Sequence, residues 1–434
     1  MLFDPLLTLY AVPLLVVWMV YLSRRRKFEM GSRAKLQAAA ESGLLEPASL
    51  HPEIDPAQCT GCGACVRACP EGDILGLIDG RAVLVEPSEC IGHGACRSAC
   101  PSNAISLVFG TAKRGVDIPH VRDDFETNVP GIFIAGELGG MGLVRNAIEQ
   151  GRQAVDSVRK LDGLGDPRRY DVVIIGSGPA GFSASLAAMQ HGLRYATIEQ
   201  DSFGGTVAHF PRGKLVMTAP ATLPLIGKVK FREISKEKLL EFWGRAARDT
   251  GLQIRYGERV ESVAATGGGF EVKTTRAAYP TRSVVLAIGR RGTPRKLDIP
   301  GEELPKVVYR LVDPVQYRGQ NVLVVGGGDS ALEAAVSIAE EPGATVTLSH
   351  RSESFSRAKM KNRERVAAAQ HAGRLNVLMA SKVDRITERT VQLSYGDKQI
   401  TIKNEAVIVC VGGILPTPFL ESIGIEVQTK YGAA

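Results

Sequence analysis

The chain has 434 residues, of which 44% are hydrophobic and 23% charged, and it contains 47 glycines. This length suffices for two or three domains with full hydrophobic cores, and the composition is that of a globular protein. It excludes a disordered chain, a collagen, a coiled coil and a protein with many membrane spans. The net charge of +7 is spread along the chain without a basic stripe, so we expect no nucleic-acid partner.

The N-terminal segment is apolar and is followed by positive charges. Residues 5–23 carry no charge, and residues 24–27 are Arg-Arg-Arg-Lys. As a helix the apolar stretch is about as long as the hydrocarbon core of a bilayer, and charges that follow it argue against a cleaved signal peptide. We predict a transmembrane anchor and basic stop in residues 1–30, with the remainder on the cytoplasmic side of a bacterial inner membrane. A buried or interfacial helix is the alternative, and residues 31–51 are predicted to form a linker.

Seven of the eight cysteines lie between residues 59 and 100, in two runs with the spacing that binds iron–sulfur clusters. In the second run a histidine replaces the second cysteine. The candidate ligands are Cys59, Cys62, Cys65 and Cys69 in the first run, and Cys90, His93, Cys96 and Cys100 in the second. The eighth cysteine, Cys410, lies in an apolar run, where we expect a packing role and no catalytic one.

Together the two runs resemble the bacterial ferredoxin domain that holds two 4Fe-4S clusters, over residues 52–109. The resemblance implies one complete ligand set, Cys59, Cys62, Cys65 and Cys100, and a second set made of Cys69, Cys90, residue 93 and Cys96. His93 departs from the family pattern and leaves three alternatives for the second site: a histidine-ligated 4Fe-4S cluster, a 3Fe-4S cluster, or no cluster. A histidine ligand would make the second cluster the more oxidising one.

Two glycine-rich turns each follow an apolar run and open a predicted helix, which is the context of a dinucleotide-binding turn. Their glycines permit the tight turn and the approach of the backbone to a pyrophosphate. The first turn and the end of the next strand contribute Gly176, Ser177, Gly178, Pro179, Ala180, Gly181, Glu199 and Gln200. The second contributes Gly326, Gly328, Asp329, Ser330, Ala331, His350, Arg351 and Arg357. The last three place positive charge where a 2′-phosphate would bind, which favours NADPH over NADH.

Two unlike dinucleotide-binding units in one chain resemble the thioredoxin-reductase-like flavoproteins, over nearly all of residues 111–434. The closest patterns are the ferredoxin–NADP reductases of that type and the bacillithiol disulfide reductases. The resemblance implies FAD in the first unit and NADPH in the second, and it adds Gly205, Thr206, Val260 and Gly289 to the FAD site. Residues 307–313 stand where true thioredoxin reductases carry their redox-active Cys-x-x-C, so a disulfide-exchange route has no thiolate.

The FAD-closing motif that this family carries at its C-terminus appears here upstream of the first turn. We therefore predict a circularly permuted flavoprotein, with a helix that begins near residue 144 and directs its positive end at the flavin. The residues implied are Gly136, Glu137, Arg145, Asn146 and Ala147. The alternative is a linker helix without this role.

The predicted fold is α/β, with two Rossmann-like domains for FAD and NADPH, an α+β ferredoxin domain and an N-terminal transmembrane helix. After the anchor and linker, the predicted segments are 52–109 (ferredoxin), 110–169 (permuted FAD closure), 170–293 (FAD domain), 294–411 (NAD(P)H domain) and 412–434 (return to the FAD domain).

The predicted function is a membrane-anchored oxidoreductase that passes electrons between NADPH, FAD and 4Fe-4S clusters. Bound cofactors carry that chemistry, so no catalytic side chain is predicted. One alternative is a reductase that acts at the flavin on a small disulfide, a quinone or another substrate. The other is a redox-sensing subunit of a membrane complex that does not turn over. We expect a homodimer, and the sequence leaves the electron partner and the direction of flow open.

Overall fold

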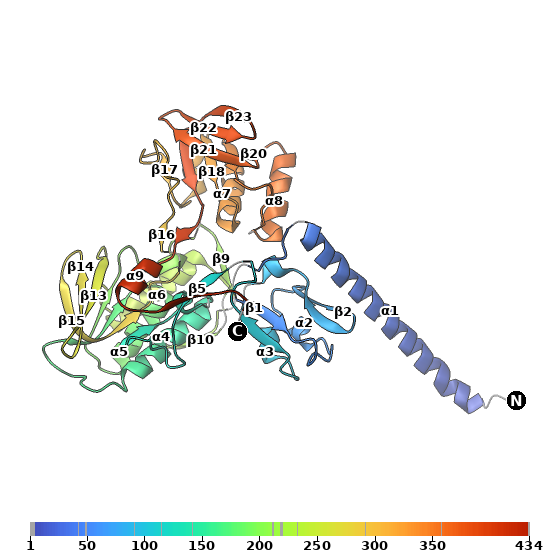
Figure 1. Ribbon diagram of the computed structural model, residues 1–434, viewed down its shortest axis with the longest axis horizontal. Coiled ribbons are helices and arrows are strands. Elements are labelled where there is room, and N and C mark those ends of the chain that lie inside the picture. The colour runs from blue at the N-terminus through green and yellow to red at the C-terminus, as the bar shows by residue number, and fades with distance from the viewer. Residues whose placement is uncertain are drawn as a thin grey trace. The chain divides into compact units, whose positions relative to one another are not determined.

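The computed structural model describes residues 5–41, 43–47, 50–90, 92–113, 115–140, 142–210, 212–217, 220–231, 233–290, 292–356 and 358–432. The chain divides into two compact units (Figure 1). The first is Met1–Gly115 together with Tyr431–Ala434, and the second is Val116–Lys430. The second unit is a mixed α/β fold, and the first contains the ferredoxin-like segment.

The first unit consists of a long helix and a small cysteine-rich domain, residues 51–108. In this domain β1 pairs with β4 and β2 with β3, both antiparallel. Its small apolar core contains two of the cysteines, Cys65 and Cys96, so the ligand-bearing loops are part of the core. The elements are α1 (Pro5–Glu41), β1 (His51–Ile54), α2 (Ala64–Ala68), β2 (Leu75–Ile78), β3 (Arg81–Leu84), η1 (Pro87–Glu89), α3 (Ala95–Ser98) and β4 (Ile105–Val108).

Helix α1 is continuous from Pro5 to Glu41, so it runs without a break through residue 30, the predicted boundary between the anchor and the linker. Its second half is held by the cysteine-rich domain. Ser32 is 4% exposed, and a Cβ built on Gly76 of β2 would lie 2.5 Å from its hydroxyl. Lys35 Nζ lies 2.7 Å from Asp73 Oδ2. This packing stabilises the helix beyond what its own sequence provides.

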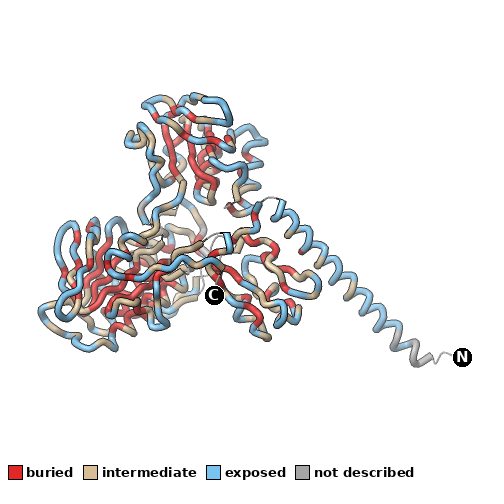
Figure 2. Tube along the Cα trace, in the orientation of Figure 1, coloured by how far each residue is buried: buried red, intermediate tan, exposed pale blue. Residues whose placement is uncertain are grey.

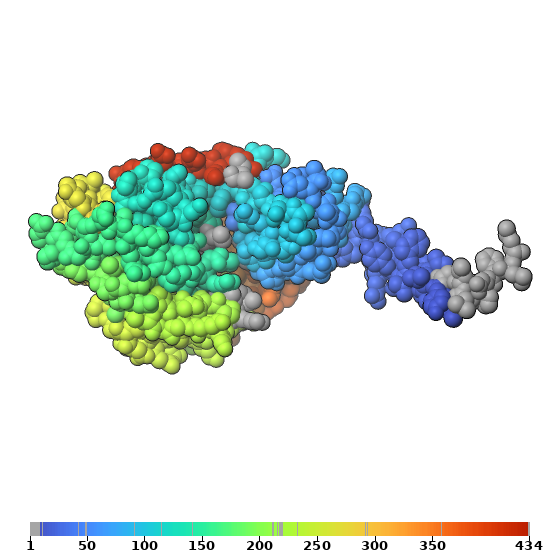
Figure 3. Space-filling view, turned by 90° about the horizontal axis from the view of Figure 1, so that it is seen from below, coloured from blue at the N-terminus to red at the C-terminus, as the bar shows by residue number. Residues whose placement is uncertain are grey.

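The first half of α1 exposes large apolar side chains, among them Leu14 (68% exposed), Val17 (66%) and Trp18 (58%). Figure 2 colours most of this helix as exposed, and Figure 3 shows its N-terminal part extending from the rest of the first unit. Within the described part of the chain, no helix combines the length and the apolar character required to cross a membrane. The finding does not support the predicted transmembrane helix. Residues 1–4, and the side chains of residues 5–8 and 11, lie outside the described residues.

The first dinucleotide-binding domain is built on a six-stranded sheet. Strand β15 pairs antiparallel with β14 through its first half, and parallel with both β7 and β6 through its second. The elements are β5 (Val116–Pro119), β6 (Ile132–Ile134), η2 (Glu137–Gly139), α4 (Val144–Val158), β7 (Tyr170–Ile175), α5 (Pro179–Gln190), β8 (Tyr195–Ile198), η3 (Gly205–Val207), β9 (Leu215–Met217), β10 (Ala221–Leu223), β11 (Gly227–Val229), β12 (Glu233–Ser235), α6 (Lys236–Thr250), β13 (Val260–Thr266), β14 (Gly269–Thr274) and β15 (Ala278–Leu286).

The segment upstream of the first glycine-rich turn is part of this domain. Strand β6 extends the parallel sheet, with Ile132 opposite Val284 of β15. Helix α4 buries Ala154 and Val155 completely in the core that also holds residues of β7, α5 and β15. A linker helix would not contribute a strand and a buried helix face to the sheet that follows it. The segment upstream of the turn therefore belongs to the same sheet and core as the residues that follow it.

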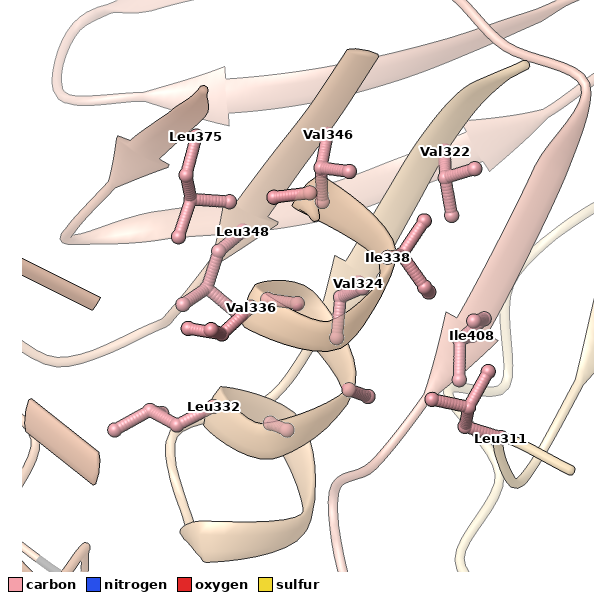
Figure 4. Close-up of a cluster of buried hydrophobic side chains, with 14 of the residues drawn as sticks. Leu311, Val322, Val324, Leu332, Val336, Ile338, Val346, Leu348, Leu375 and Ile408 are labelled. Carbon is pink, nitrogen blue, oxygen red and sulfur yellow. The ribbon is translucent and has the colours of Figure 1, made fainter. Parts of the chain in front are cut away.

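The second dinucleotide-binding domain has a parallel sheet in the order β17-β24-β18-β19-β20 and a separate antiparallel sheet β21-β22-β23. Side chains of β18, β19, β24 and α7 converge in its core (Figure 4). The elements are β16 (Thr293–Pro294), β17 (Val307–Val308), η4 (Pro314–Tyr317), β18 (Asn321–Val325), α7 (Asp329–Ala339), β19 (Thr345–Ser349), α8 (Met360–His371), β20 (Leu375–Leu378), β21 (Ser381–Ile386), β22 (Thr390–Tyr395), β23 (Lys398–Lys403) and β24 (Ala406–Val409).

The C-terminal segment returns to the first dinucleotide-binding domain. It forms β25 (Gly413–Ile414), α9 (Thr417–Ser422) and β26 (Val427–Lys430), and Leu420 joins the core on one face of the sheet. Strand β26 pairs antiparallel with β5. The return ends at Lys430 and not at residue 434, because Gly432 donates a backbone hydrogen bond to Phe109 of the first unit's own chain segment.

The contact between α4 and α5 depends on a glycine. A Cβ built on Gly151 would lie 2.1 Å from the carbonyl oxygen of Ala180. We expect Gly151→Ala to lower the free energy of unfolding by about 1–3 kcal/mol, because the two helices must move apart.

Gly244→Ala in α6 is the matched control, since the nearest atom to its added Cβ is the flexible end of Arg248 at 3.6 Å. The free energy of unfolding of this variant is expected to rise by about 0.5–1 kcal/mol, because alanine is favoured over glycine inside a helix. Urea unfolding of both variants measures the difference. Equal stability of the two would contradict the proposed helix contact.

Candidate functional site

Four cysteines of the first unit surround one hollow. Cys59, Cys62, Cys65 and Cys100 line it. Two backbone amides point at its sulfurs, Ala82 N–H at Cys59 Sγ (3.4 Å) and Ala104 N–H at Cys100 Sγ (3.3 Å). Such N–H···S bonds stabilise the negative charge of an iron–sulfur cluster. The thiols share the space, and within the described residues no His, Cys, Asp and Glu group is arranged around a single metal ion. Four thiols around one hollow are the donor set that a 4Fe-4S cluster requires.

The thiols of this set are neutral while they carry protons. Burial above all, with a smaller contribution from the neighbouring Cys59, Cys96 and Cys62, raises the pKa of Cys65 to about 11. Burial also acts on Cys100, but hydrogen bonds from Ser102 and Ala104 leave its pKa lowered. Metal ligation requires the thiolate, so cluster assembly at this site must release protons.

The second predicted set uses the same two short helices, since Cys69 is the C-cap of α2 and Cys96 lies in α3. Cys69, Cys90 and Cys96 are at least partly buried, and burial raises the pKa of Cys90 to about 11, with Cys96 and Cys69 adding to the shift. His93 is half-buried, and burial lowers its pKa, because desolvation favours the neutral imidazole. The neutral form is the one that ligates metals.

The first glycine-rich turn leaves no room for side chains. Gly176 has a φ of +102°, and a Cβ on it would lie 2.5 Å from the carbonyl oxygen of Ala287. A Cβ on Gly181 would lie 1.9 Å from the carbonyl oxygen of Gly176. Gly178 is the N-cap of α5, and Pro179 and Ala180 form its first turn. The turn thus presents backbone amides at the start of a helix, the arrangement that binds a pyrophosphate.

Glu199 follows β8 and is bonded to that turn. Its carboxylate accepts hydrogen bonds from Ser177 N–H (2.8 Å) and Ser177 Oγ–H (3.0 Å). The backbone of Glu258 donates to the carbonyl of Glu199 at 3.0 Å, which brings the start of β13, where Val260 lies, to the same edge. Gln200 is exposed. The acidic residue therefore lies where the resemblance requires, with its carboxylate already oriented by the turn.

The upstream motif meets the first turn. A Cβ on Gly136 would lie 3.0 Å from Cβ of Ala180 and 3.8 Å from Cβ of Ala147. Gly136 donates its N–H to Gln150 of α4 at 2.8 Å, and Glu137 begins η2. Arg145 and Asn146 lie in the first turn of α4, exposed and half-buried respectively.

Two further predicted loops reach this region. A Cβ on Gly205 would lie 2.9 Å from Cα of Gly178, so the loop of η3, which includes Thr206, covers the turn. Gly289 follows β15 with a φ of +65° and open space at its Cβ position. The predicted FAD residues are thus brought together by one domain.

Arg290 was not predicted. Burial lowers the pKa of Arg290, while the negative charges of Glu137 and Asp117 oppose that shift. Its guanidinium donates to the carbonyl of Asp117 at 2.7 Å. A half-buried positive charge beside Glu137 is suited to a phosphate or to reduced flavin. The residues that it contacts lie more than 150 residues away in sequence, so no local sequence pattern predicts a role for Arg290.

The second glycine-rich turn has the same construction. Gly326 has a φ of +145°, and its Cβ would lie 2.3 Å from the carbonyl oxygen of Cys410. Gly328 is the N-cap of α7, and Ala331 is fully buried, while Ser330 is exposed. Asp329 accepts hydrogen bonds from Lys359 N–H (2.8 Å) and Asn362 Nδ2 (2.7 Å). Its carboxylate therefore fixes the loop that follows β19 and the start of α8.

The predicted phosphate-binding cations begin directly after β19. The ring of His350 stacks on Phe355 at 5.3 Å and lies within 2.1 Å of a Cβ position at Gly327, so it rests on the glycine-rich turn. Arg351 is exposed. Arg357 lies outside the described residues.

The segment that stands in the place of a redox dithiol, residues 307–313, contains no cysteine. Tyr309 donates to Glu302 at 2.7 Å, and the guanidinium of Arg310 lies 2.7 Å from Nδ1 of His209. This contact also was not predicted, because its members are 101 residues apart. Burial raises the pKa of Cys410 to about 12, so this thiol stays protonated and offers no substitute nucleophile.

Comparisons with known proteins agree with this division of the chain. A family described as pyridine nucleotide-disulphide oxidoreductase matches residues 173–433, and a 4Fe-4S dicluster domain matches residues 51–101. Bacilliredoxin reductase Bdr of Bacillus subtilis is 28% identical over 60% of this chain and 82% of its own length. A ferredoxin–NADP reductase of Ignicoccus hospitalis is 30% identical over 60% of this chain and 83% of its own.

Solved structures give the same result. The bacillithiol disulfide reductase of Bacillus cereus superposes with a TM-score of 0.53 and 25% identity, covering 59% of this chain and 82% of its own. The family match begins at residue 173, although β6 and α4 before it belong to the same sheet and core.

Gly181→Ala tests the flavin site. Because its Cβ would overlap the carbonyl oxygen of Gly176, the turn must shift, and we expect purified protein to retain only a small fraction of its flavin. The flavin-to-protein absorbance ratio measures the effect.

Ser183→Ala, in the same helix, is the matched control. Ser183 Oγ is buried and has no hydrogen-bond partner among the described residues, so its removal leaves nothing unpaired. Flavin content should stay at the wild-type level. Full flavin occupancy in Gly181→Ala would contradict the assignment of the turn.

Proposed function

We propose, for a chain that belongs to the pyridine nucleotide-disulphide oxidoreductase family and also carries a 4Fe-4S dicluster domain, that NADPH and iron–sulfur centres exchange electrons through FAD. The protein is an FAD-dependent pyridine nucleotide oxidoreductase with a ferredoxin domain, similar to ferredoxin–NADP reductases. The observation that carries the proposal is the ring of four thiols around one hollow in the chain that also carries both nucleotide turns.

The bound groups supply the redox chemistry: FAD accepts two electrons from a nicotinamide and releases them singly, and each cluster carries one. The residues of the chain bind these groups and orient them. The turn at Gly176 and the start of α5 face the pyrophosphate, and Glu199 is the ribose partner. Arg290 places positive charge beside Glu137. His350 and Arg351 support a preference for NADPH, because cations at this position bind a 2′-phosphate.

A route through an enzyme dithiol is not available to this chain. Cys410 is the single cysteine beyond residue 100, and its buried thiol has a pKa raised to about 12. Disulfide exchange needs a thiolate and a second cysteine to resolve the mixed disulfide. The electrons of the flavin therefore leave for the clusters or for an acceptor bound at the flavin itself. Because one relative is a bacilliredoxin reductase, an acceptor bound at the flavin is the alternative to be tested.

Anaerobic titration with NADPH distinguishes the two outlets. We expect wild-type protein to lose both flavin and iron–sulfur absorbance, and to develop the paramagnetic signal of a reduced cluster. Cys65→Ser removes a buried ligand of the complete set, and it should abolish the signal of that cluster while NADPH still bleaches the flavin.

Cys410→Ser serves as control, because it removes a thiol that lies outside both ligand sets. Its flavin and iron–sulfur absorbance and its paramagnetic signal should respond to NADPH as those of the wild-type protein do. Flavin reduction in wild-type protein with the clusters left oxidised would contradict the proposal and favour an acceptor at the flavin.

The location of the protein is a separate proposal. We propose that the exposed apolar half of α1 associates with the cytoplasmic face of the bacterial inner membrane. Contiguous exposed apolar surface of this size marks an interaction site, and the exposed basic residues 24–27 beside it are attracted to anionic lipid.

Flotation with vesicles that contain phosphatidylglycerol tests this association. Wild-type protein should float with the vesicles, and the double variant Leu14→Asp, Val17→Asp should not. Val312→Asp is the control, since Val312 is also exposed, at 56%, but lies in the second unit. Equal flotation of all three proteins, or of none, would overturn the proposal.

A further inference from the structure

The loop around His93 repeats the backbone of the loop around Cys62. In the first loop Gly61 and Gly63 have φ values of +65° and +72°, and in the second Gly92 and Gly94 both have +75°. Each second glycine is the left-handed N-cap of a short helix, α2 or α3. His93 thus occupies, between its two glycines, the place that Cys62 occupies between its own.

Both loops are fixed by close backbone contacts at their first glycine. A Cβ on Gly61 would lie 1.9 Å from the carbonyl oxygen of Gly80, and a Cβ on Gly92 would lie 2.4 Å from that of Leu50. Left-handed φ values and such contacts admit only glycine. The correspondence between His93 and Cys62 is therefore one of three-dimensional backbone geometry as well as of sequence spacing.

The imidazole of His93 has a buried nitrogen with nothing to bind. Nε2 is shielded from solvent and has no hydrogen-bond partner among the described residues. An unpaired buried polar atom costs roughly 1–3 kcal/mol, so it calls for a partner such as a bound ion. A surface histidine in a glycine-rich loop would turn this nitrogen to water instead.

Three thiols lie near one another in this part of the domain, and Glu71 is a charged neighbour of two of them, Cys69 and Cys90, as well as of His93. Cys90 lies within electrostatic range of Cys96 and Cys69, and Cys96 lies within range of Cys69. Cys96 is 6% exposed and belongs to the core of the domain. One imidazole nitrogen and three thiols make the four protein ligands that a 4Fe-4S cluster needs.

We propose that Nε2 of His93 is the fourth ligand of a second 4Fe-4S cluster, whose other ligands are Cys69, Cys90 and Cys96. The inference rests on the proposed function, because it names the ligands of a centre on that electron route. It selects one of the three alternatives that the sequence leaves for this site. A three-iron cluster would leave Nε2 of His93 without a partner, and so would an empty site.

The ligand exchange sets the order of the two centres. Imidazole is neutral where thiolate carries a negative charge, so the second cluster has one negative charge fewer than an all-cysteine cluster. Each cluster takes up one electron on reduction, and no ligand bond forms or breaks. The second cluster is therefore reduced at a higher potential than the first, and an electron that reaches the domain comes to rest on it.

The test uses the full-length protein reconstituted with iron and sulfide, reduced chemically with dithionite so that neither FAD nor NADPH is involved. Wild-type protein should bind about eight iron atoms per chain. With ¹⁵N-labelled histidine, pulsed paramagnetic resonance of the cluster that is reduced first should show a nitrogen coupling.

His93→Cys supplies the all-thiolate set. It should keep about eight iron atoms, lose the nitrogen coupling and shift the potential of the second cluster downward. His93→Ala should lose at least one iron. His371→Asn, in the exposed last turn of α8, is the control and should match wild type in every readout.

Two results would overturn the inference: a wild-type protein without nitrogen coupling, or a coupling that persists in His93→Cys. Neither affects the proposed function, because the cluster of Cys59, Cys62, Cys65 and Cys100 and its reduction by NADPH do not depend on His93. Conversely, failure of NADPH to reduce any cluster leaves the iron count and the nitrogen coupling as they are.

Discussion

Direct contact between one stretch of backbone and another, possible only through glycine, is the constraint on which every site of this molecule depends. The same geometry recurs in three places: a carbonyl oxygen fills the position of a missing Cβ at Gly61 in a cysteine loop, at Gly181 in the first nucleotide turn and at Gly326 in the second. It occurs again at Gly151, where α4 approaches α5. A methyl group at any of these positions forces apart the segments that present amides or thiols to a ligand. Ligand binding and chain packing therefore rest on the same few residues.

Sequence reasoning recovers what is encoded locally. Cysteine spacing and glycine-rich turns specify backbone geometry over about a dozen residues, and the structure gathers four of the eight candidate cluster ligands around one hollow. Long-range contacts are a different matter. The continuity of α1 through residue 30 depends on its packing against Gly76, and the role of Arg290 depends on Glu137 in a segment more than 150 residues upstream. The contact between Arg310 and His209 is of the same kind. No periodicity or spacing rule connects such residues, since their proximity is created by the sheet.

Fusion of a ferredoxin domain to a reductase changes the kinetics of electron exchange. Separate proteins must meet by diffusion, and their rate depends on concentration and on ionic strength. Within one chain the encounter becomes intramolecular, with an effective concentration set by the connecting residues. Here the connection to the cysteine-rich domain is short, because β4 ends at Val108 and β5 begins at Val116. Strong charge complementarity between the domains is then unnecessary.

The pairing of β5 with β26 gives the reductase an unusual independence from its neighbours in the chain. The polypeptide enters this unit through one strand and leaves it through the adjacent one, with Val116 opposite Lys430. Segments whose two ends meet in this way can be inserted into or removed from a host protein without disturbing either fold. The flavoprotein is thus a self-contained domain whose first and last strands are adjacent, and a different electron-carrying domain could be joined to it in place of the present one.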